Sequence, residues 1–261
     1  MKAKTELLLY RLLWLAEKPM RPTFRNIEDS FEGWSYRHGL LAQVDRLEAQ
    51  GLIESIRDPR TGERLHRLTE AGRLAASGGR DPVAAWSEKW DGRWRLILFD
   101  IPESERSKRK KLTRALSTAG FGCLQGSVWI SPLTPPPIEK LVSGEDPVCS
   151  HLLMLHAESK GRCVDERMVA EAWDFEAINR QYEAYLAVMD RFAALPRPCS
   201  PGAFEDWTAA EQSAWKAALA IDPLLPGELL PKDYPGRKAW NLRKQVLSEA
   251  ARLSGSLREP H

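Results

Sequence analysis

The stretch WDGRWRLILFDIPESERSKRKKLTRALSTAGFGCLQGSVWISP, residues 90–132, decides the fold of the middle of the chain. Its apolar run Arg95–Ile101 has the length of a buried strand. Residues 104–120 follow as a helix with leucines and alanines on one side and mostly basic residues elsewhere. The segments CLQ and SVWIS are two short strands joined by a tight turn at Gly126. A strand, a basic helix and two closely spaced strands are therefore predicted.

Two further elements extend this pattern. Pro135–Val142 predicts a short helix, and His151–Leu155 (HLLML) predicts a fourth strand. The order βαββαβ is that of a ferredoxin-like fold, which we expect over residues 93–160. Residues 81–92 are expected to be a linker whose tryptophans pack against the protein.

The first 80 residues have the element order of a winged helix-turn-helix. The predicted helices cover residues 4–17, 23–31 and 35–50. Gly51 supplies the left-handed residue that ends the third helix, and the strands LIESIR and RLHRL then flank a turn at residues 58–62. Thr69 caps the helix that follows. Three helices and a two-stranded hairpin in this order predict a winged-helix domain.

In a winged helix-turn-helix, the third helix enters the major groove and the hairpin approaches the phosphates. The polar side of the helix at 35–50 lies opposite an apolar stripe of Leu40, Val44 and Leu47. Candidates for base contact are Ser35, Tyr36, Arg37, His38, Gln43 and Arg46. Candidates for phosphate contact are Arg57, Arg60 and Arg64. Residues 34–67 hold six arginines against five acids, a balance that an ordinary solvated helix and hairpin would also show.

The composition is that of a folded protein: of 261 residues, 43% are hydrophobic and 28% are charged. The net charge of +2 and the pI near 8.3 are too mild to indicate nucleic-acid binding by themselves, so any basic surface must be local. The four cysteines lack metal-ligand spacing, and no segment approaches the roughly 20 apolar residues of a membrane span. We expect a cytoplasmic protein with reduced cysteines, no membrane association, no metal and no cofactor.

Residues 161–261 predict an all-helical domain. One long helix is expected at 167–195, because apolar and aromatic residues recur there at steps of three and four. After a Pro-rich break, Thr208 and Glu211 form a capping box that starts the next helix. A second Pro-rich link leads to a last helix at 237–253. The many aromatic side chains of this half suit either a packed core or an aromatic effector.

Three segments of the chain resemble one family. They are LILFDIPESERSKRKKLTRALSTAGFGCLQGSVWISP at 96–132, RLTEAGR at 67–73 and IDPLLPGELLPKDYPGRKA at 221–239. On these segments the chain resembles the PaaX family of bacterial transcriptional repressors. That family joins a winged helix, a ferredoxin-like domain related to a small CRISPR-associated endonuclease, and a C-terminal helical domain. The resemblance implies an α+β multidomain fold with domains at 1–80, 93–160 and 161–261.

The resemblance also implies a function. PaaX-like repressors respond to aryl-acid CoA thioesters such as phenylacetyl-CoA, whose phosphates and aromatic head suit basic and aromatic side chains. Candidate effector-binding residues are Arg93, Trp94, Arg95, Arg109 and Trp129. We therefore expect a non-enzymatic repressor that binds a double-stranded DNA operator as a homodimer and is relieved by an acyl-CoA effector.

Two other classes of function stay open. Asp100 ends the first predicted strand of the middle domain where the related nuclease has a metal-binding aspartate, so a metal-dependent nuclease is one alternative. A turn-stabilising hydrogen bond before Pro102 explains the same aspartate without a metal. The other alternative is a scaffold whose winged helix contacts protein. The basic helix at 104–114 suits DNA, an anionic effector or plain solvent alike.

Overall fold

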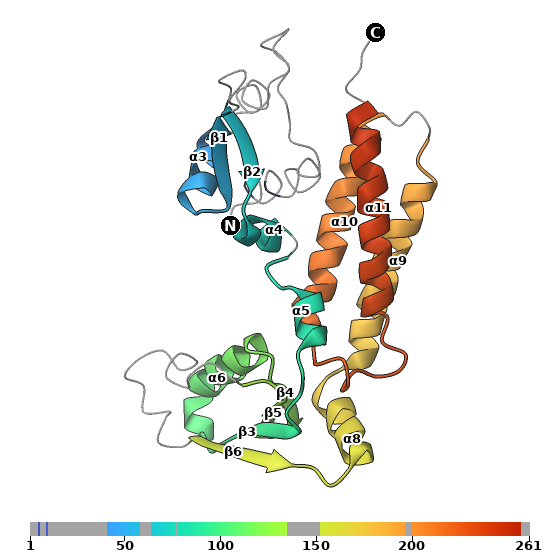
Figure 1. The fold of residues 1–261 in the computed structure, drawn as a ribbon. Coiled ribbons are helices and arrows are strands. Elements are labelled where there is room, and N and C mark those ends of the chain that lie inside the picture. Colours follow the sequence, from blue (N-terminus) through green and yellow to red (C-terminus); the bar gives the residue numbers. More distant parts are fainter. Residues whose placement is uncertain are drawn as a thin grey trace. The chain divides into compact units, whose positions relative to one another are not determined.

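The computed structural model describes most of the chain and is drawn as a ribbon in Figure 1. The described residues are Thr5, Leu9, 41–57, 64–76, 78–134, 152–196 and 200–256. The chain divides into two compact units, one comprising Met1–Asp81, Gln181–Ala218 and Gly236–His261, the other Pro82–Arg180 and Leu219–Pro235. Helices and two small antiparallel sheets make the fold α+β. Among the described helices, none is long and apolar enough to cross a membrane.

The N-terminal module is a helix, a hairpin and a second helix. Its elements are α3 (Leu41–Ala49), β1 (Ile53–Arg57), β2 (Arg64–Leu68) and α4 (Glu70–Ala76). The strands pair antiparallel, and Gly51, with a φ of 67°, follows α3 as its left-handed stop. The predicted strands and the predicted stop are therefore confirmed.

Other predictions for this module fall outside the described residues. They concern the helix at 23–31, the start of the third helix at 35–40 and the hairpin turn at 58–62. Of the predicted helix at 4–17, Thr5 and Leu9 are described, and both are helical.

A buried cluster and a cap hold the module together. Val44 and Leu47 of α3 are 3% and 0% exposed and pack with strand residues, which confirms the two described members of the predicted stripe. The Thr69 hydroxyl accepts a hydrogen bond from Gly72 N at 3.0 Å, as the predicted N-cap requires. A Cβ added to Gly72 would lie 1.8 Å from the carbonyl oxygen of Leu52. Glycine is therefore required where α4 crosses the connection between α3 and β1.

The second unit is built on a four-stranded antiparallel sheet. Its strands are β3 (Arg93–Phe99), β4 (Gly122–Gln125), β5 (Val128–Ser131) and β6 (Leu152–Glu158). Their order in space is β4-β5-β3-β6, so β4 and β6 are the edges. A 3-10 turn (Glu103–Glu105) and α6 (Arg106–Thr118) connect β3 to β4. The predicted strands and basic helix are confirmed with small shifts at their ends, whereas the helix predicted at 135–142 lies outside the described residues.

Different parts of the chain cover the two faces of this sheet. The cluster on the α6 side comprises Ile97, Phe99, Ile101, Leu112, Leu116, Phe121 and Trp129. The cluster on the opposite side comprises Trp94, Ile130, Val169, Leu225 and Leu229. Because side chains alternate along a strand, β3 contributes to both clusters. Val169 belongs to α8 (Arg162–Ala172), while Leu225 and Leu229 come from the Pro-rich link.

The segment expected to be a linker contains a short helix, α5 (Pro82–Ser87). Trp86 in this helix is 9% exposed, and its ring meets Tyr234 edge-on at 5.9 Å between centroids. The Trp86 carbonyl also accepts a hydrogen bond from Gly227 N at 3.0 Å. The tryptophan packs as expected, and its partners come from the Pro-rich link far along the sequence.

The single long helix predicted at 167–195 is wrong. The structure has α8 and then α9 (Phe175–Ala193), separated at Trp173 and Asp174. Trp173 is extended, with φ −130° and ψ 138°, and Asp174 Oδ1 accepts a hydrogen bond from Ala177 N at 2.8 Å. Asp174 thus caps a new helix inside an apolar pattern that has the helical spacing on both sides.

The capping box predicted at Thr208 is also wrong. The helix there, α10 (Pro201–Ile221), begins seven residues earlier, where Ser200 Oγ accepts a hydrogen bond from Ala203 N at 3.2 Å. Thr208 and Glu211 are 7% and 0% exposed within the helix. The prediction from the capping-box pattern failed because Glu211 is a buried residue of the helix core and does not cap the helix. The last helix, α11 (Gly236–Ser256), runs beside α9 and α10 in Figure 1.

Candidate nucleic-acid interface and effector site

The N-terminal module presents a polar helix face next to a hairpin. In α3, Arg46 is exposed and Gln43 is half-buried, while Val44 and Leu47 turn into the core. A long cation on the face opposite a buried stripe is suited to reach a groove or a phosphate. The remaining base-contact candidates, Ser35, Tyr36, Arg37 and His38, lie outside the described residues.

The hairpin places arginines at its turn end. Arg57 and Arg64 are the last rung of the β1–β2 ladder and stand opposite one another, while Arg60 lies outside the described residues. Nearer the base of the hairpin, Arg67 Nη2 is paired with Glu54 Oε1 at 2.6 Å. The β1–β2 register therefore places two of the three phosphate candidates at the same end of the hairpin.

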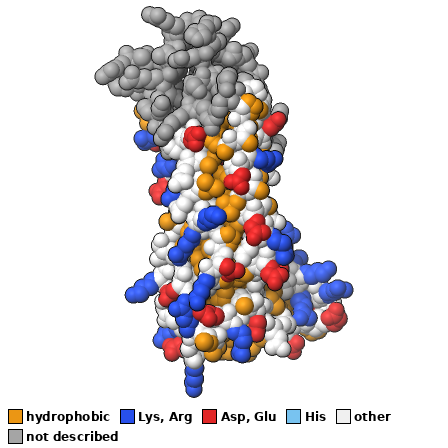
Figure 2. Space-filling model, turned by 90° about the vertical axis from the view of Figure 1, so that its right-hand side faces the viewer, with side chains coloured by type: hydrophobic (Ala, Val, Ile, Leu, Met, Phe, Trp, Pro, Cys, Tyr) orange, Lys and Arg blue, Asp and Glu red, His pale blue; other side chains and the backbone are white. Residues whose placement is uncertain are grey.

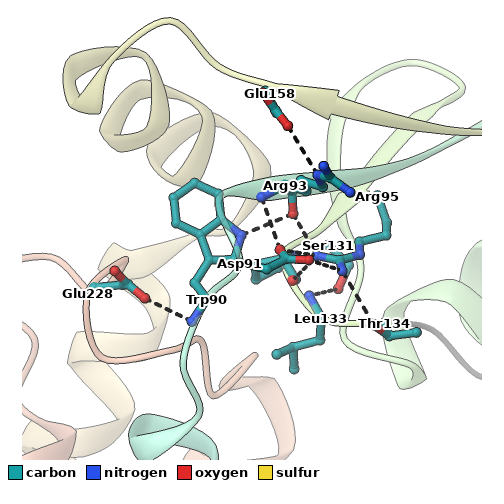
Figure 3. A network of polar contacts seen from close by, with 10 residues as sticks. Trp90, Asp91, Arg93, Arg95, Ser131, Leu133, Thr134, Glu158 and Glu228 are labelled. Carbon is teal, nitrogen blue, oxygen red and sulfur yellow. Dashed lines mark hydrogen bonds and ion pairs between the residues drawn. The ribbon is translucent and has the colours of Figure 1, made fainter.

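A network of polar contacts surrounds Arg95, one of the effector candidates (Figure 3). Its Nη1 and Nη2 donate to the two carboxylate oxygens of Asp91 at 2.7 and 2.6 Å, and Nη1 also donates to the carbonyl of Pro132 at 2.8 Å. These bonds tie the start of β3 to the end of β5. The hydrogen bond from Arg95 holds the pKa of Asp91 at about 2, below its ordinary value of 3.8. Arg95 is thus occupied by the protein's own groups.

The two residues before Arg95 differ sharply in exposure. Arg93 is on the surface, where its Nε donates to Glu158 at 3.1 Å. Trp94 is 0% exposed, and its Nε1 donates to the buried Asp165 at 2.7 Å. Its ring lies 5.3 Å from that of Trp90 between centroids. Trp94 is therefore a core residue of the α8 side.

The other two effector candidates lie on the α6 side of the sheet. Trp129 is 8% exposed within the apolar cluster, and its Nε1 has no hydrogen-bond partner among the residues that the structure describes. Arg109 of α6 is half-buried and donates to Ser127 Oγ at 3.4 Å. Of the five candidates, Arg93 is exposed and Arg109 is half-buried, whereas Trp94, Arg95 and Trp129 are buried.

The metal alternative can be compared with the described residues. Asp100 is exposed directly after β3. Among the residues that the structure describes, no three His, Cys, Asp or Glu side chains are grouped so that they could hold a metal ion. Cys123 and Cys163 are free thiols, and the other two cysteines lie outside the described residues.

The helical part also contains a buried polar cluster that the sequence patterns did not predict. Glu211 Oε1 accepts hydrogen bonds from Tyr185 OH at 2.9 Å and from Arg243 Nε at 2.8 Å. The Arg243 guanidinium carbon lies 4.8 Å from the ring centroid of Trp215 and 6.0 Å from that of Trp240. Burial raises the pKa of the Glu211 carboxyl, against the lowering effect of Arg243. These residues come from α9, α10 and α11, so spacing within one helix could not reveal them.

The surface gives a further view of charge. On the face shown in Figure 2, Lys and Arg side chains are interspersed with Asp and Glu, and hydrophobic side chains form a band between them. This mixed face agrees with the small net charge of +2.

The helix α6 carries a local group of positive charges. Its exposed basic residues are Arg106, Lys110, Lys111 and Arg114.

Comparison with known proteins gives two matches to one family. The model described as "PaaX protein central Cas2-like domain" matches residues 87–169, which contain the sheet unit's strands. The model described as "PaaX-like protein C-terminal domain" matches residues 173–257, which contain α9, α10 and α11. Together the two matches cover well over half of the chain.

Individual relatives are more distant. The chain is 24% identical over 214 residues to the transcriptional repressor PaaX of Escherichia coli (strain K12), across 79% of this chain and 66% of that protein. It therefore spans just under two thirds of that relative's length. The fold is similar to that of the uncharacterized protein Rv0674 from Mycobacterium tuberculosis, with a TM-score of 0.55, 20% identity and coverage of 97% and 98% of the two chains. With both family domains matched in their chain order, this protein belongs to the PaaX family.

Proposed function

We propose that this chain is a DNA-binding transcriptional regulator without enzymatic activity, a repressor that a small effector relieves. Its family supports this, as does the E. coli relative, which is named a transcriptional repressor. The observation that carries the proposal is the module ahead of the two family domains. There α3 buries Leu47 and exposes Arg46, and an antiparallel hairpin follows directly.

In this proposal the module at 1–80 is a winged helix, with α3 as its recognition helix and β1–β2 as its wing. Gln43 and Arg46 carry donors suited to adenine and guanine edges. Ser35, Tyr36, Arg37 and His38 precede them in the sequence and complete the reading surface. Arg57, Arg60 and Arg64 contact phosphates.

The rest of the chain carries dimerisation and effector response. The four-stranded sheet unit at 93–160 is the ferredoxin-like domain, and residues 161–261 are the helical domain. We infer that the chain binds a double-stranded operator as a homodimer, because two-fold symmetry pairs the two half-sites of an operator. An effector that binds one conformation better than the other shifts the population away from the DNA-binding state.

The proposed effector is an aryl-acyl-CoA thioester. Its phosphates carry negative charge, and the candidate cations that are not buried are the exposed Arg93 and the half-buried Arg109. Trp94, Arg95 and Trp129 support the sheet that carries Arg93 and that packs against α6, the helix of Arg109. Thermal unfolding followed against a panel of acyl-CoA thioesters tests this, because a ligand that binds only the native state raises the apparent stability. A panel in which no thioester raises the melting temperature would contradict the effector class.

DNA binding is tested by fluorescence anisotropy on operator sites selected from random duplexes. Arg46→Ala is expected to weaken the selected site by about 1–3 kcal/mol and to lose base discrimination, whereas Arg60→Ala weakens all sequences alike and lowers the salt slope by about one. The control is Arg162→Ala, which removes an exposed arginine of α8 that is paired with Glu166. It should bind like the wild type.

The alternatives give distinct outcomes in the same assay. A wild type without any salt-dependent affinity for DNA contradicts the proposal and favours a protein-binding scaffold. Cleavage of the duplex in Mg²⁺ that disappears in Asp100→Ala favours a nuclease.

A further inference from the structure

The helix α6 presents a row of positive charges to solvent. The buried Leu112 and Leu116 fix which side of the helix packs against the sheet. At about 100° per residue, the opposite side carries four exposed basic residues within about 140° of arc. This surface, the cationic face of α6, consists of Arg106, Lys110, Lys111 and Arg114. The other exposed residues of the helix are Ser107, Ser117 and Thr118, so α6 holds no carboxylate on this side.

The cationic face of α6 lacks the counter-charges that other helices of the chain provide. In α8 and α9, exposed arginines are paired with a glutamate four residues away, in Arg162–Glu166, Arg167–Glu171 and Arg180–Glu176. Within the part of the chain that the structure describes, no carboxylate forms an ion pair with the cationic face, whereas Glu105, just before α6, pairs with Lys108 at 3.1 Å. The four charges of the face are therefore not neutralised by described residues.

This arrangement is unfavourable for an isolated helix. Arg106, Lys110 and Arg114 follow one another at steps of four residues, and like charges at this spacing repel each other. The first turn contains no acidic residue, so its cations lie unbalanced at the positive end of the helix dipole. Burial of Leu112 and Leu116, which are 3% and 0% exposed, holds the helix in place. An anionic partner would relieve the repulsion on the outer side.

The length and chemistry of the face suit the phosphates of a nucleic-acid duplex. At a rise of about 1.5 Å per residue, Arg106 and Arg114 are roughly 12 Å apart along the helix axis. One strand of a DNA duplex carries about one phosphate per 3.4 Å of its axis, so this length corresponds to about three or four phosphates. Lysine, arginine, serine and threonine are also side chains that commonly bind phosphate oxygens.

The same face disfavours two other anionic partners. Single-stranded nucleic acids bind to aromatic side chains on which their bases stack, and a membrane surface binds helices that also expose an apolar side. The exposed residues of α6 are lysine, arginine, serine and threonine, without an aromatic or apolar side chain among them. The backbone of a duplex is therefore the partner that this surface fits best.

We propose that the cationic face of α6 binds the phosphate backbone of duplex DNA, as a second DNA contact besides the module at 1–80. This contact rests on the DNA binding of the proposed function and extends it to the sheet unit. Because phosphates carry no base information, the face raises the affinity for all sequences alike and leaves the choice of operator to the first module. It supplies a local positive charge that the net charge of +2 does not reveal.

The test removes three charges and compares salt slopes. The variant Arg106→Gln/Lys110→Gln/Arg114→Gln keeps good helix formers in α6. Fluorescence anisotropy with a random-sequence duplex, repeated over a range of salt concentrations, gives the slope of log affinity against log salt concentration. The loss of three phosphate contacts should lower the magnitude of this slope by about 2–3. Affinity for a selected operator should fall by the same factor as affinity for the random duplex.

The matched control removes the same net charge elsewhere. It is the variant Arg162→Gln/Arg167→Gln/Arg180→Gln, in which the three lost cations have glutamate partners, and it should keep the wild-type slope. A charge-retaining variant, Arg106→Lys/Arg114→Lys, should keep the slope as well. The single variant Lys111→Gln should lower the slope by about one and serves if the triple variant does not fold by circular dichroism.

The outcomes separate this inference from the proposed function. A triple α6 variant with the wild-type slope overturns the inference alone, and so does a control variant that loses as much slope as the α6 variant. A loss of stabilisation by acyl-CoA with an unchanged DNA slope also overturns it, because the effector would then be the bound anion. Affinity that depends on α6 but is equal for all sequences and unaffected by Arg46→Ala supports the inference and contradicts the regulator. A wild type without salt-dependent DNA affinity contradicts both.

Discussion

Two buried arginines of this chain pair with carboxylates in opposite ways. In the sheet unit, Arg95 uses its terminal nitrogens, which bind both oxygens of Asp91, while its buried Nε has no partner among the described residues. In the helical part, Arg243 uses its Nε to bind one oxygen of Glu211, while the described part of the chain offers no partner to its Nη2 or to the second Glu211 oxygen. Both oxygens of the first carboxylate are therefore bound, whereas only one oxygen of the second accepts a hydrogen bond from the described residues.

The carboxylates also differ in their exposure to water. The Asp91 side chain is 48% exposed, whereas that of Glu211 is 0% exposed. Water can solvate the first carboxylate if its arginine is lost, but the second would remain a bare charge in a medium of low dielectric. We therefore expect loss of the arginine to lower the free energy of unfolding less at the Asp91 pair than at the Glu211 pair.

The two pairs also connect different parts of the fold. Arg95 fastens the chain where β3 begins and β5 ends, within one sheet. Glu211 and Arg243 link α10 to α11, and Tyr185 adds α9 through its hydroxyl. The Arg95–Asp91 pair holds neighbouring backbone segments of one sheet together, whereas the Glu211–Arg243 pair, with Tyr185, joins three helices.

The largest expected effect comes from breaking the helical pair. Arg243→Met should lower the free energy of unfolding by about 3–5 kcal/mol, because it leaves the Glu211 carboxylate buried without a counter-charge. Urea unfolding followed by far-ultraviolet circular dichroism measures this, and the loss of the cation over the two tryptophan rings contributes to it.

The double variant Glu211→Leu/Arg243→Met is the matching control. It removes both charges and should recover most of the stability, since apolar residues of similar volume often replace a buried ion pair without loss. A double variant as unstable as Arg243→Met would show that packing, not the unpaired charge, causes the effect.

Arg95→Met should lower the free energy of unfolding by a smaller amount, about 1–3 kcal/mol, measured by the same urea unfolding. It leaves the buried carbonyl oxygen of Pro132 without this donor, which carries the cost of an unsatisfied buried acceptor, whereas the Arg93 carbonyl keeps its hydrogen bond from Trp90 Nε1. The control is Arg93→Met on the same strand, where an exposed ion pair with Glu158 is lost and a change below about 1 kcal/mol is expected. Equal losses in the two variants would contradict the role given to the Arg95 network.

The sequence predicted what depends on local patterns. The strand at Arg95–Ile101, the basic helix and the stop at Gly51 follow from periodicity, strand length and glycine conformation, and the structure has all three. The resemblance to PaaX proteins also identified the family that the comparisons show. Which strands lie at the edges of the sheet depends on the order of the strands in space, and local sequence patterns do not contain that order.

Most of the failures come from tertiary contacts that override a local signal. The helix predicted at 167–195 breaks because Asp174 caps a second helix and Trp173 packs near Gly122. The capping pattern at Thr208 failed because Glu211 is the partner of Arg243, 32 residues away in sequence. Likewise, Trp94 and Trp129 are candidate effector-binding residues by sequence, but both are buried in the two cores of the sheet.

The smallest expected effect is a difference in pH dependence between the stabilities that the Asp91 and Glu211 carboxylates contribute. The pKa of Asp91 is about 2 in the folded chain against an ordinary value of 3.8, so its stabilising contribution is present above about pH 4 and is lost as the pH falls towards 2. The wild type should therefore lose its advantage over Asp91→Asn in that window of urea unfolding. The pKa of Glu211 is raised, so the wild type should instead lose stability relative to Glu211→Gln as the pH rises above 4.5. Two variants with the same pH dependence would contradict the contrast between the half-exposed and the buried pair.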